Sequence, residues 1–252
     1  MRTQPFFWYE LMTPDPDAAA KFYAGVVGWK PQAFDMAGGS TYTVLNVGER
    51  GVGGVMAMPQ PDLPPAWVGY VYTPDIAAAC EKLQKAGGKV HRPPTVIPTV
   101  GTFAVVGDPQ GAMFMFLAPE GPDQPQIDRA ARGQVGWHEL YTSDWRAALD
   151  FYSGQFGWTK EGEFDMGEMG IYALFGFENG VQSGGMMNKP DMIPMPVWQF
   201  YFNVEDVDAG AKRVTENGGK VLMGPMEVPG GSRVVQCQDP QGAHFALLAP
   251  VR

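Results

Sequence analysis

The sequence predicts an α+β protein of two homologous modules. Each module consists of two βαβββ units that form a cup-shaped mixed sheet with helices on its convex face. Two observations predict this fold. Residues 8–29 and 137–158 are identical at 12 of 22 positions, and residues 108–119 and 239–250 are identical at 9 of 12. The chain of 252 residues therefore repeats itself at a spacing of about half its length.

The repeats divide the chain into a first module at residues 1–119, a linker at 120–134 and a second module at 135–252. The linker is assigned because this segment is rich in Pro, Gly and polar residues and lacks apolar periodicity.

Alternating apolar residues and helical spacing place the elements within a module. In the first unit, residues 5–13 alternate as a strand, and Asp15 or Thr13 can cap the helix that follows. We expect the remaining strands of the first module at 33–37, 41–48, 52–58, 67–73, 89–91, 102–107 and 112–118, with a second helix after Asp75. Gly pairs separate several of these elements, among them Gly38-Gly39 and Gly87-Gly88.

Composition limits the class of protein. A net charge of -9 argues against a nucleic-acid partner, and no apolar run is long enough to cross a membrane. The N-terminus lacks the features of a signal peptide. Cys80 and Cys237 lie far apart, which favours two free, buried thiols. We expect a cytoplasmic protein.

Two repeated motifs resemble a known superfamily. The strand–Thr-x-Asp–helix stretches from Trp8 to Trp29 and from Trp137 to Trp158, and the turns Asp-Pro-Gln-Gly at 108–111 and 239–242, resemble the vicinal oxygen chelate superfamily. That superfamily holds glyoxalase I, bleomycin resistance proteins and extradiol dioxygenases. More narrowly, the chain is similar to tandem two-module glyoxalase-like proteins.

The resemblance implies a divalent metal on the concave face, held by His or Glu at fixed places. Counted from the shared landmarks, those places hold residues that do not bind metals: Trp8, Trp137, Gly69, Phe200, Met115 and Ala246. A shift of one residue in the count brings in Tyr9, Tyr70 or Tyr201, which are weak ligands, and His138, which is the one good ligand among them. We therefore predict no cofactor; a divalent metal remains possible, but its ligand positions are substituted.

The three histidines have different expected roles. His138 is expected on the helix-covered face, hydrogen-bonded to backbone, and His91 is expected to be exposed. His244 shares the concave face with Glu139, and the two could act as an acid–base pair. Glu10 is the first-module counterpart of Glu139, where Met113 replaces the histidine. Both glutamates could instead be structural carboxylates.

The other residues expected on the concave face are bulky and apolar or aromatic. Either they fill the cup, or they grip a flat organic ligand by stacking. They are Trp8, Met12, Trp67, Met113 and Met115 in the first module and Trp137, Tyr141, Trp198 and Phe200 in the second.

Three functions follow from the resemblance and the residues. The first is a glyoxalase-like lyase or isomerase acting on a small oxygenated or aromatic metabolite without the usual metal ligands. The second is a metal-free protein that sequesters a drug-like compound. The third is an extradiol-type dioxygenase, for which the two-His, one-carboxylate set is missing. The expected partner is a small molecule, with the chain as a monomer containing an internal pseudo-dimer or as a homodimer.

Overall fold

The computed structural model of the chain describes residues 5–36, 39, 41–60, 62–121, 128–177 and 180–249. Gly38 of the predicted Gly38-Gly39 turn and part of the predicted linker lie outside these residues.

The first half of the chain folds as two βαβββ units. Its elements are β1 (Trp8–Thr13), α1 (Pro16–Val26), β2 (Lys30–Asp35), β3 (Thr41–Val47) and β4 (Arg50–Ala57), followed by β5 (Ala66–Tyr72), α2 (Ile76–Lys85), β6 (Lys89–Ile97), β7 (Gly101–Gly107) and β8 (Met113–Pro119).

The second half repeats this order with one added 3₁₀ turn. Its elements are β9 (Val135–Thr142), α3 (Trp145–Phe156), β10 (Thr159–Asp165), η1 (Gly167–Met169), β11 (Ile171–Gly176), β12 (Gln182–Asn188), β13 (Val197–Asn203), α4 (Val207–Glu216), β14 (Lys220–Glu227), β15 (Arg233–Gln238) and β16 (His244–Ala249).

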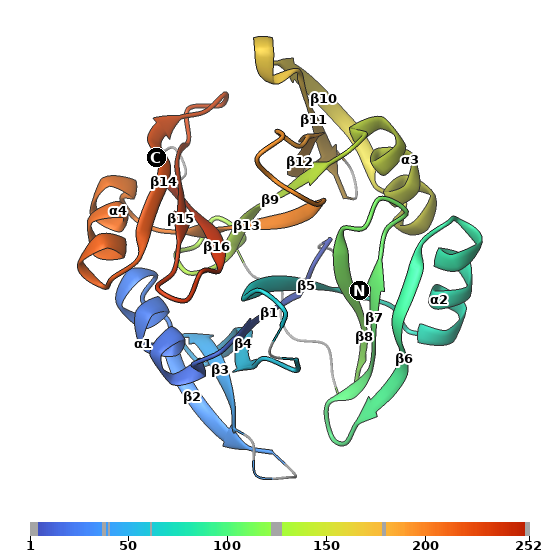
Figure 1. Cartoon of the computed structure of the whole chain (residues 1–252), viewed down its shortest axis with the longest axis horizontal. Helices are drawn as coiled ribbons and strands as arrows, with labels where there is room; N and C mark the ends of the chain where they lie inside the picture. The colour runs from blue at the N-terminus through green and yellow to red at the C-terminus, as the bar shows by residue number, and fades with distance from the viewer. Residues whose placement is uncertain are drawn as a thin grey trace. The chain divides into compact units, whose positions relative to one another are not determined.

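Each half forms one eight-stranded mixed sheet, with strand orders β2-β3-β4-β1-β5-β8-β7-β6 and β10-β11-β12-β9-β13-β16-β15-β14. The first strand of each unit runs parallel to the last strand of that unit. The hairpin neighbours within a unit are antiparallel. These sheets confirm the predicted α+β class with two βαβββ units in each half (Figure 1).

An aspartate begins every one of the four α-helices in the described part of the chain. Asp15, Asp75, Asp144 and Asp206 each accept a hydrogen bond from a backbone N–H in the first helical turn. Such a cap stabilises a helix by about 1 kcal/mol because the first N–H groups have no partner within the helix. The structure thus selects Asp15 over Thr13 as the cap of α1.

Strand β6 is longer than the 89–91 segment expected from the sequence. Pro93 and Pro94 lie inside it, and the β6–β7 register shifts on both sides of Arg92. Proline is tolerated here because β6 is the edge strand of its sheet, where one row of N–H groups needs no partner. Strand β2 likewise begins earlier than expected, at Lys30.

The chain packs into two compact units, and each unit contains segments from both halves of the chain. One comprises Met1–Phe7, Gly69–Pro125 and His138–Trp198; the other comprises Trp8–Val68, Gln126–Trp137 and Gln199–Arg252. We call them the 69–198 unit and the 8–252 unit. In the 8–252 unit, α1 lies along β2–β4 and α4 along β14 and β15 (Figure 1).

The core of the 8–252 unit is organised around Tyr23 of α1. Its hydroxyl accepts a hydrogen bond from Trp67 Nε1 at 2.9 Å and donates one to Asp239 Oδ2 at 3.1 Å. The Tyr23 ring also contacts Phe202 and Phe245 edge to face. Asp239 comes from the second Asp-Pro-Gln-Gly turn, so this turn joins the end of the chain to its first helix.

The 69–198 unit repeats this arrangement around Tyr152 of α3. The Tyr152 hydroxyl accepts from Trp198 Nε1 at 3.0 Å and donates to Asp108 Oδ2 at 3.2 Å. Trp158 stacks on the Tyr152 ring. The repeated Phe-Tyr, Gly-Trp and Asp-Pro-Gln-Gly motifs of the sequence therefore build the contacts that connect the two halves.

The glutamine of each turn adds a second connection. Gln110 accepts from the Asp144 backbone N–H at 2.6 Å and donates to the Asp144 carbonyl at 2.8 Å. Gln241 contacts Asp15 in the same two ways, and it also accepts from the Thr13 hydroxyl. Each turn thus fixes the cap residue of a helix from the other half.

The buried phenols predict a loss of stability at alkaline pH. Desolvation, reinforced by Asp239 and Asp108 respectively, raises the pKa of Tyr23 and of Tyr152 well above 10. Below about pH 10 these phenols are protonated in both the folded and the unfolded chain. Above about pH 10 only the unfolded chain releases the protons, so the free energy of unfolding falls by up to about 1.4 kcal/mol per pH unit for each tyrosine.

Urea unfolding midpoints between pH 8 and 11 test this expectation. The double variant Tyr23→Phe, Tyr152→Phe should start lower at pH 8, because two buried hydrogen bonds at each site are lost, but decline less steeply above pH 10. Equal slopes for the variant and the parent would contradict the assignment.

Candidate functional site

Each sheet has one face covered by helices and an opposite face, which we call the open face. On β16, Phe245 and Leu247 are fully buried, and Phe245 contacts Tyr23 of α1. Because strand side chains alternate, His244, Ala246 and Leu248 lie on the open face. The same reasoning places Trp8, Glu10 and Met12 of β1 on the open face of the first sheet.

A chain of hydrogen bonds links Trp8, Tyr42 and Glu10 in the 8–252 unit. Trp8 Nε1 donates to the Tyr42 hydroxyl at 3.0 Å, and that hydroxyl donates to Glu10 Oε2 at 3.0 Å. Glu10 is 6% exposed. Desolvation, with the Glu10 carboxylate as the next cause, raises the pKa of Tyr42 well above 10, so its phenol stays protonated at neutral pH.

Glycine makes room for this arrangement. Gly54 lies opposite Glu10 in the β1–β4 register, and a Cβ at Gly54 would overlap the Tyr42 hydroxyl. A methyl group there would therefore displace the phenol from Glu10.

The second module repeats the Glu–Gly–Tyr arrangement in the 69–198 unit. Gly185 lies opposite Glu139 in the β9–β12 register, and a Cβ at Gly185 would overlap the ring of Tyr172. Glu139 is 6% exposed, like Glu10. Both modules thus hold a buried carboxylate beside a glycine that a tyrosine ring covers.

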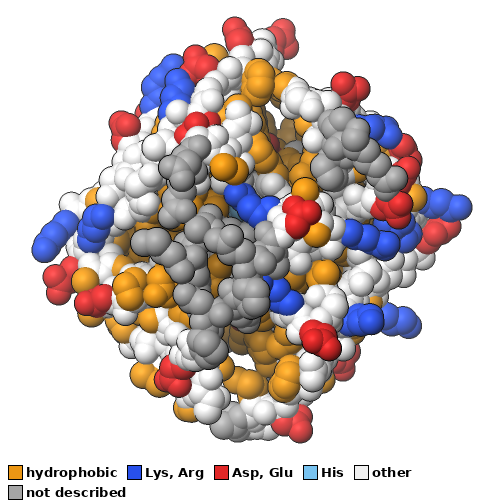
Figure 2. Space-filling model, turned by 180° about the vertical axis from the view of Figure 1, so that it is seen from behind, with side chains coloured by type: hydrophobic (Ala, Val, Ile, Leu, Met, Phe, Trp, Pro, Cys, Tyr) orange, Lys and Arg blue, Asp and Glu red, His pale blue; other side chains and the backbone are white. Residues whose placement is uncertain are grey.

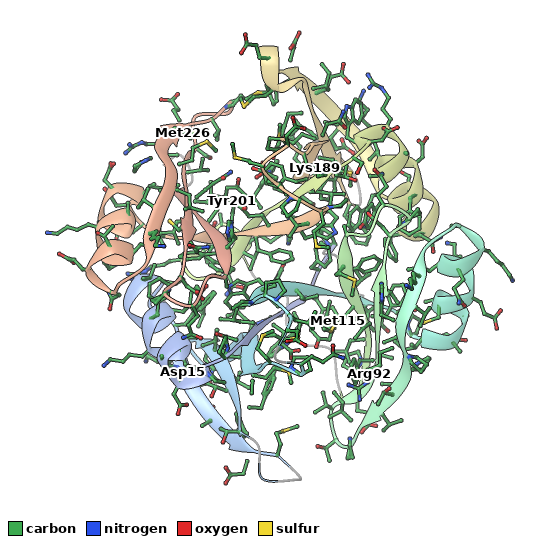
Figure 3. The ribbon with its side chains drawn as sticks, in the orientation of Figure 1. Asp15, Arg92, Met115, Lys189, Tyr201 and Met226 are labelled. Atoms are coloured by element: carbon green, nitrogen blue, oxygen red, sulfur yellow. The ribbon has the colours of Figure 1, made fainter. Side chains whose placement is uncertain are left out.

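The open face of β13–β16 in the 8–252 unit carries a mainly apolar cluster. Its buried members are Tyr201, Val234 and Ala246, and the partly buried members packed on them are Trp137, Met226, Val228 and Leu248. We call these seven residues the Tyr201 cluster. Figure 3 shows Tyr201 on β13 and Met226 on β14, both directed to the same side of this sheet.

Three polar side chains lie next to the Tyr201 cluster. Gln236 Nε2 donates to the Tyr201 hydroxyl at 3.3 Å. Gln238 Nε2 lies 3.2 Å from His244 Nε2, and His244 is exposed. This part of the open face therefore offers a phenol, amides and an imidazole around an apolar surface.

The open face of β8 carries Met113 and Met115, as expected. Met113 is 36% exposed, whereas Met115 is 4% exposed and lies opposite Tyr70 in the β5–β8 register. Tyr141 of β9 is on the same face as Glu139 and is buried.

The structure corrects the predicted direction of Trp67, Trp198 and Phe200. Trp67 and Trp198 donate hydrogen bonds to the tyrosines of α1 and α3, and Phe200 contacts the Tyr9 ring on the helix-covered face. The cause is a one-residue difference in strand phase, which reverses every side chain of a strand. Tyr70 and Tyr201 occupy the open-face positions instead.

The histidine predictions have different outcomes. His138 is fully buried, contacts the Phe6 ring, and has Nδ1 2.8 Å from the Ser183 carbonyl oxygen, which confirms a core histidine bound to backbone. His91 is exposed, as expected. Glu139 and His244 belong to different compact units, so their pairing stays a prediction. Cys80 and Cys237 are free and buried, as expected.

The side chains that the structure describes do not form a donor set for a metal ion. Within the described ranges, no three His, Cys, Asp or Glu side chains lie close enough together to share a metal. In the last strand of the second sheet, β16, the position where a metal ligand is expected holds Ala246. The residue opposite Ala246 on the neighbouring strand β13 is Tyr201. Trp8 Nε1 is a donor only and cannot coordinate a cation.

Tyr42, Tyr172 and Gln236 are candidate site residues that the sequence analysis missed. Tyr42 and Tyr172 occupy equivalent places in the two repeats, each two residues before an apolar residue of the same strand. A comparison of the two repeats could therefore have identified both tyrosines. Nothing local in the sequence marks Gln236.

The described surface mixes charged and hydrophobic side chains (Figure 2). On the face seen in Figure 2, basic and acidic side chains are interspersed among hydrophobic ones, with no large basic patch among the described residues there. None of the described helices is long and apolar enough to cross a membrane.

Curated relatives match almost the whole chain. A Mycobacterium tuberculosis protein named "Putative glyoxylase CFP32" is 31% identical over 250 residues, covering 96% of this chain and 94% of the relative. The anthracycline biosynthesis protein DnrV of Streptomyces peucetius is 29% identical over 256 residues, covering 96% and 91%.

Solved structures share the fold at low identity. 2,2',3-Trihydroxybiphenyl 1,2-dioxygenase from Sphingomonas wittichii strain RW1 aligns with a TM-score of 0.72 and 11% identity, covering 98% of this chain and 91% of that one. The Mn(II)-bound glyoxalase from Novosphingobium aromaticivorans aligns with a TM-score of 0.66 and 16% identity, covering 100% and 83%.

A family model matches the chain twice, at residues 6–116 and 128–247. These two stretches contain the repeated motifs, every strand of both sheets except the last residues of β8 and β16, and all the open-face residues described above except Leu248. The chain therefore belongs to the Glyoxalase/Bleomycin resistance protein/Dioxygenase superfamily.

Proposed function

We propose that this protein binds a small, planar, oxygenated aromatic molecule on the open face of its sheets, without a metal ion held by the protein. The observation that carries the proposal is the Tyr201 cluster with Gln236 beside it. Aromatic and methionine side chains bind flat rings by dispersion and stacking, and a few polar groups fix their orientation.

The description of one relative supports this ligand class. DnrV is described as an anthracycline biosynthesis protein, and anthracyclines are planar molecules that carry several oxygen substituents on fused aromatic rings. At the places where the resemblance puts a metal, this chain offers indole and phenol groups together with the thioether of Met115 and the methyl group of Ala246. Hydrogen bonding and stacking are therefore the means by which such a ligand would be held.

Fluorescence titration of the protein with a dihydroxyanthraquinone tests the proposal. After treatment with EDTA, the protein should bind this probe at micromolar concentration, and added Mn²⁺, Zn²⁺ or Ni²⁺ should change the affinity less than about threefold. Trp137→Leu should weaken binding about 10-fold, equivalent to about 1.4 kcal/mol, because the ring that packs on the Tyr201 cluster is lost.

The matched control is Trp8→Leu, which alters the equivalent residue of the first module. Equal weakening by both variants would place ligands in both modules. Binding that requires an added metal, or that neither variant affects, would contradict the proposal.

The contact between Tyr42 and Glu10 favours a second candidate, a metal-independent lyase or isomerase. A buried carboxylate held by a protonated phenol can act as a general base toward a carbon acid such as a keto-aldehyde adduct. Glu10 and Glu139 would take the proton in the two modules. An extradiol dioxygenase has less support, because the described donors do not supply its iron ligands.

Turnover of a methylglyoxal–glutathione adduct by EDTA-treated protein tests this second candidate. A loss of about 100-fold or more in Glu10→Gln or Glu139→Gln, with anthraquinone binding retained, would support proton transfer. Binding without turnover in the parent protein would leave the binding function alone.

A further inference from the structure

We propose that the open face of β6–β8 is an anion-recognition site, in which Arg92 binds the carboxylate of an aromatic or similarly apolar ligand. The inference rests on the proposed small-molecule function and specifies the charge of the ligand that the first module accepts.

Arg92 is held against an aromatic ring on the open face. Its guanidinium carbon lies 4.9 Å from the centroid of the Phe103 ring. Phe103 is in β7, where Ala104 lies opposite Phe116, and Phe116 packs in the helix-covered core. Alternation therefore directs Phe103, and Arg92 above it, to the open face. Stacking on a ring restricts the guanidinium plane while leaving its N–H groups available to a carboxylate.

The charge of Arg92 has no acidic partner within the described residues. Surface lysines and arginines elsewhere do form ion pairs, among them Lys85 with Glu81, Lys160 with Glu163, Lys212 with Glu216 and Arg233 with Asp208. The chain carries 27 acidic residues against 18 basic ones. An exposed arginine that stacks on a ring and has no acidic neighbour in such a chain is available to an anionic ligand.

The surroundings of Arg92 are apolar or neutral. Met115 lies on the same face of the sheet, as Figure 3 shows, and Val105 lies opposite both Arg92 and Met115 in the strand registers. A Cβ at Gly107 would lie 3.0 Å from His91 Nε2 and 3.5 Å from Met113 Sδ, so these two side chains flank the same strand. Partial desolvation, with Lys89 as the next cause, lowers the pKa of the exposed His91, which favours its neutral form.

The second module lacks this site, although its strands are equivalent. With the constant spacing of 131 residues between the two Asp-Pro-Gln-Gly turns, Arg92 corresponds to Met223 and Phe103 to Val234. The cation and its supporting ring are thus replaced together by neutral aliphatic side chains. The Tyr201 cluster includes Val234, so the second module offers an uncharged surface where the first offers a guanidinium.

The experiment compares the affinities of 1-hydroxy-2-naphthoate and its methyl ester by calorimetry, using the full chain after EDTA treatment. The parent protein should bind the carboxylate at least 10-fold more tightly than the ester, and this preference should shrink as salt is raised, because an exposed ion pair is screened. Arg92→Met, which introduces the residue of the second module, should remove the preference, because it weakens binding of the carboxylate at least 10-fold more than binding of the ester. Arg92→Lys should retain part of it.

Lys85→Met is the matched control, because it removes one positive charge from an exposed position on α2 in the same unit. It should leave the preference intact, and melting temperatures should show that all variants are folded. A preference that survives in Arg92→Met, or one that Lys85→Met also removes, would overturn the inference. If the parent binds the ester and the acid equally, only this inference fails; if it binds neither, the proposed function fails with it.

Discussion

When the chain is divided into residues 1–125 and 126–252, the two fragments are expected to form one folded 1:1 complex, and neither is expected to fold as a monomer. Each compact unit contains one half of each module, so a separated module would expose core surfaces. In the 8–252 unit, Phe22 packs on Phe245 and Arg213 Nε donates to the Val26 carbonyl at 2.9 Å. Truncating a buried aromatic side chain costs about 3–5 kcal/mol, and a separated fragment loses several such contacts.

Light scattering after size-exclusion chromatography, together with circular dichroism, measures this outcome. Tyr23→Phe in the first fragment should weaken the complex at least 10-fold, because Trp67 Nε1 and Asp239 then lose their common buried partner. A fragment alone could also form a homodimer, since each module carries both kinds of contact surface. A monomeric fragment that melts cooperatively would contradict the expectation.

Gly184→Ala is expected to destabilise the protein by about 3 kcal/mol or more. A Cβ at Gly184 would overlap the carbonyl oxygen of His138 and lie 2.5 Å from the Phe175 ring. Phe175 is fully buried and stacked on Trp158, and the His138 carbonyl belongs to the adjacent parallel strand, so neither can yield cheaply. The strand would have to separate from its neighbour to admit the methyl group.

Gly154→Ala provides the matched control. Gly154 lies within α3, where a Cβ would meet nothing within 4 Å. Because alanine loses less backbone freedom than glycine in a helix, this change should stabilise the protein by about 0.5–1 kcal/mol. Urea unfolding midpoints of the two variants should therefore move in opposite directions. A Gly184→Ala midpoint at or above that of the parent would refute the steric argument.

Much of the fold could be predicted because its signals are local and repeated. The aspartate caps, the glycine stops and the apolar alternation act over a few residues, and the internal repeat doubles each signal. The candidate site was predicted less completely. Glu10, Trp8, Met113 and Met115 lie on the open face as expected, but Trp67, Trp198 and Phe200 do not, because an error of one residue in a strand reverses every side chain.

The partners of these residues could not be predicted because they are distant in the sequence. Tyr42 reaches Glu10 from another strand, and Gln236 reaches Tyr201 from 35 positions away. The sequence also gives no indication that Arg92 stacks on Phe103. The two residues come from neighbouring strands, and the β6–β7 register shifts between Arg92 and Thr95, where the two prolines lie.

The sequence by itself determined the two-module architecture, its α+β class and its superfamily. Only the tertiary structure decided what the repeated motifs do. Their tyrosines, tryptophans and Asp-Pro-Gln-Gly turns join one half of the chain to the other. The candidate site is instead formed by side chains on the open faces of the sheets. The reason is physical: a repeat specifies local structure, but hydrogen bonds and ring contacts depend on which strands and helices pack together, and that packing is a property of the whole fold.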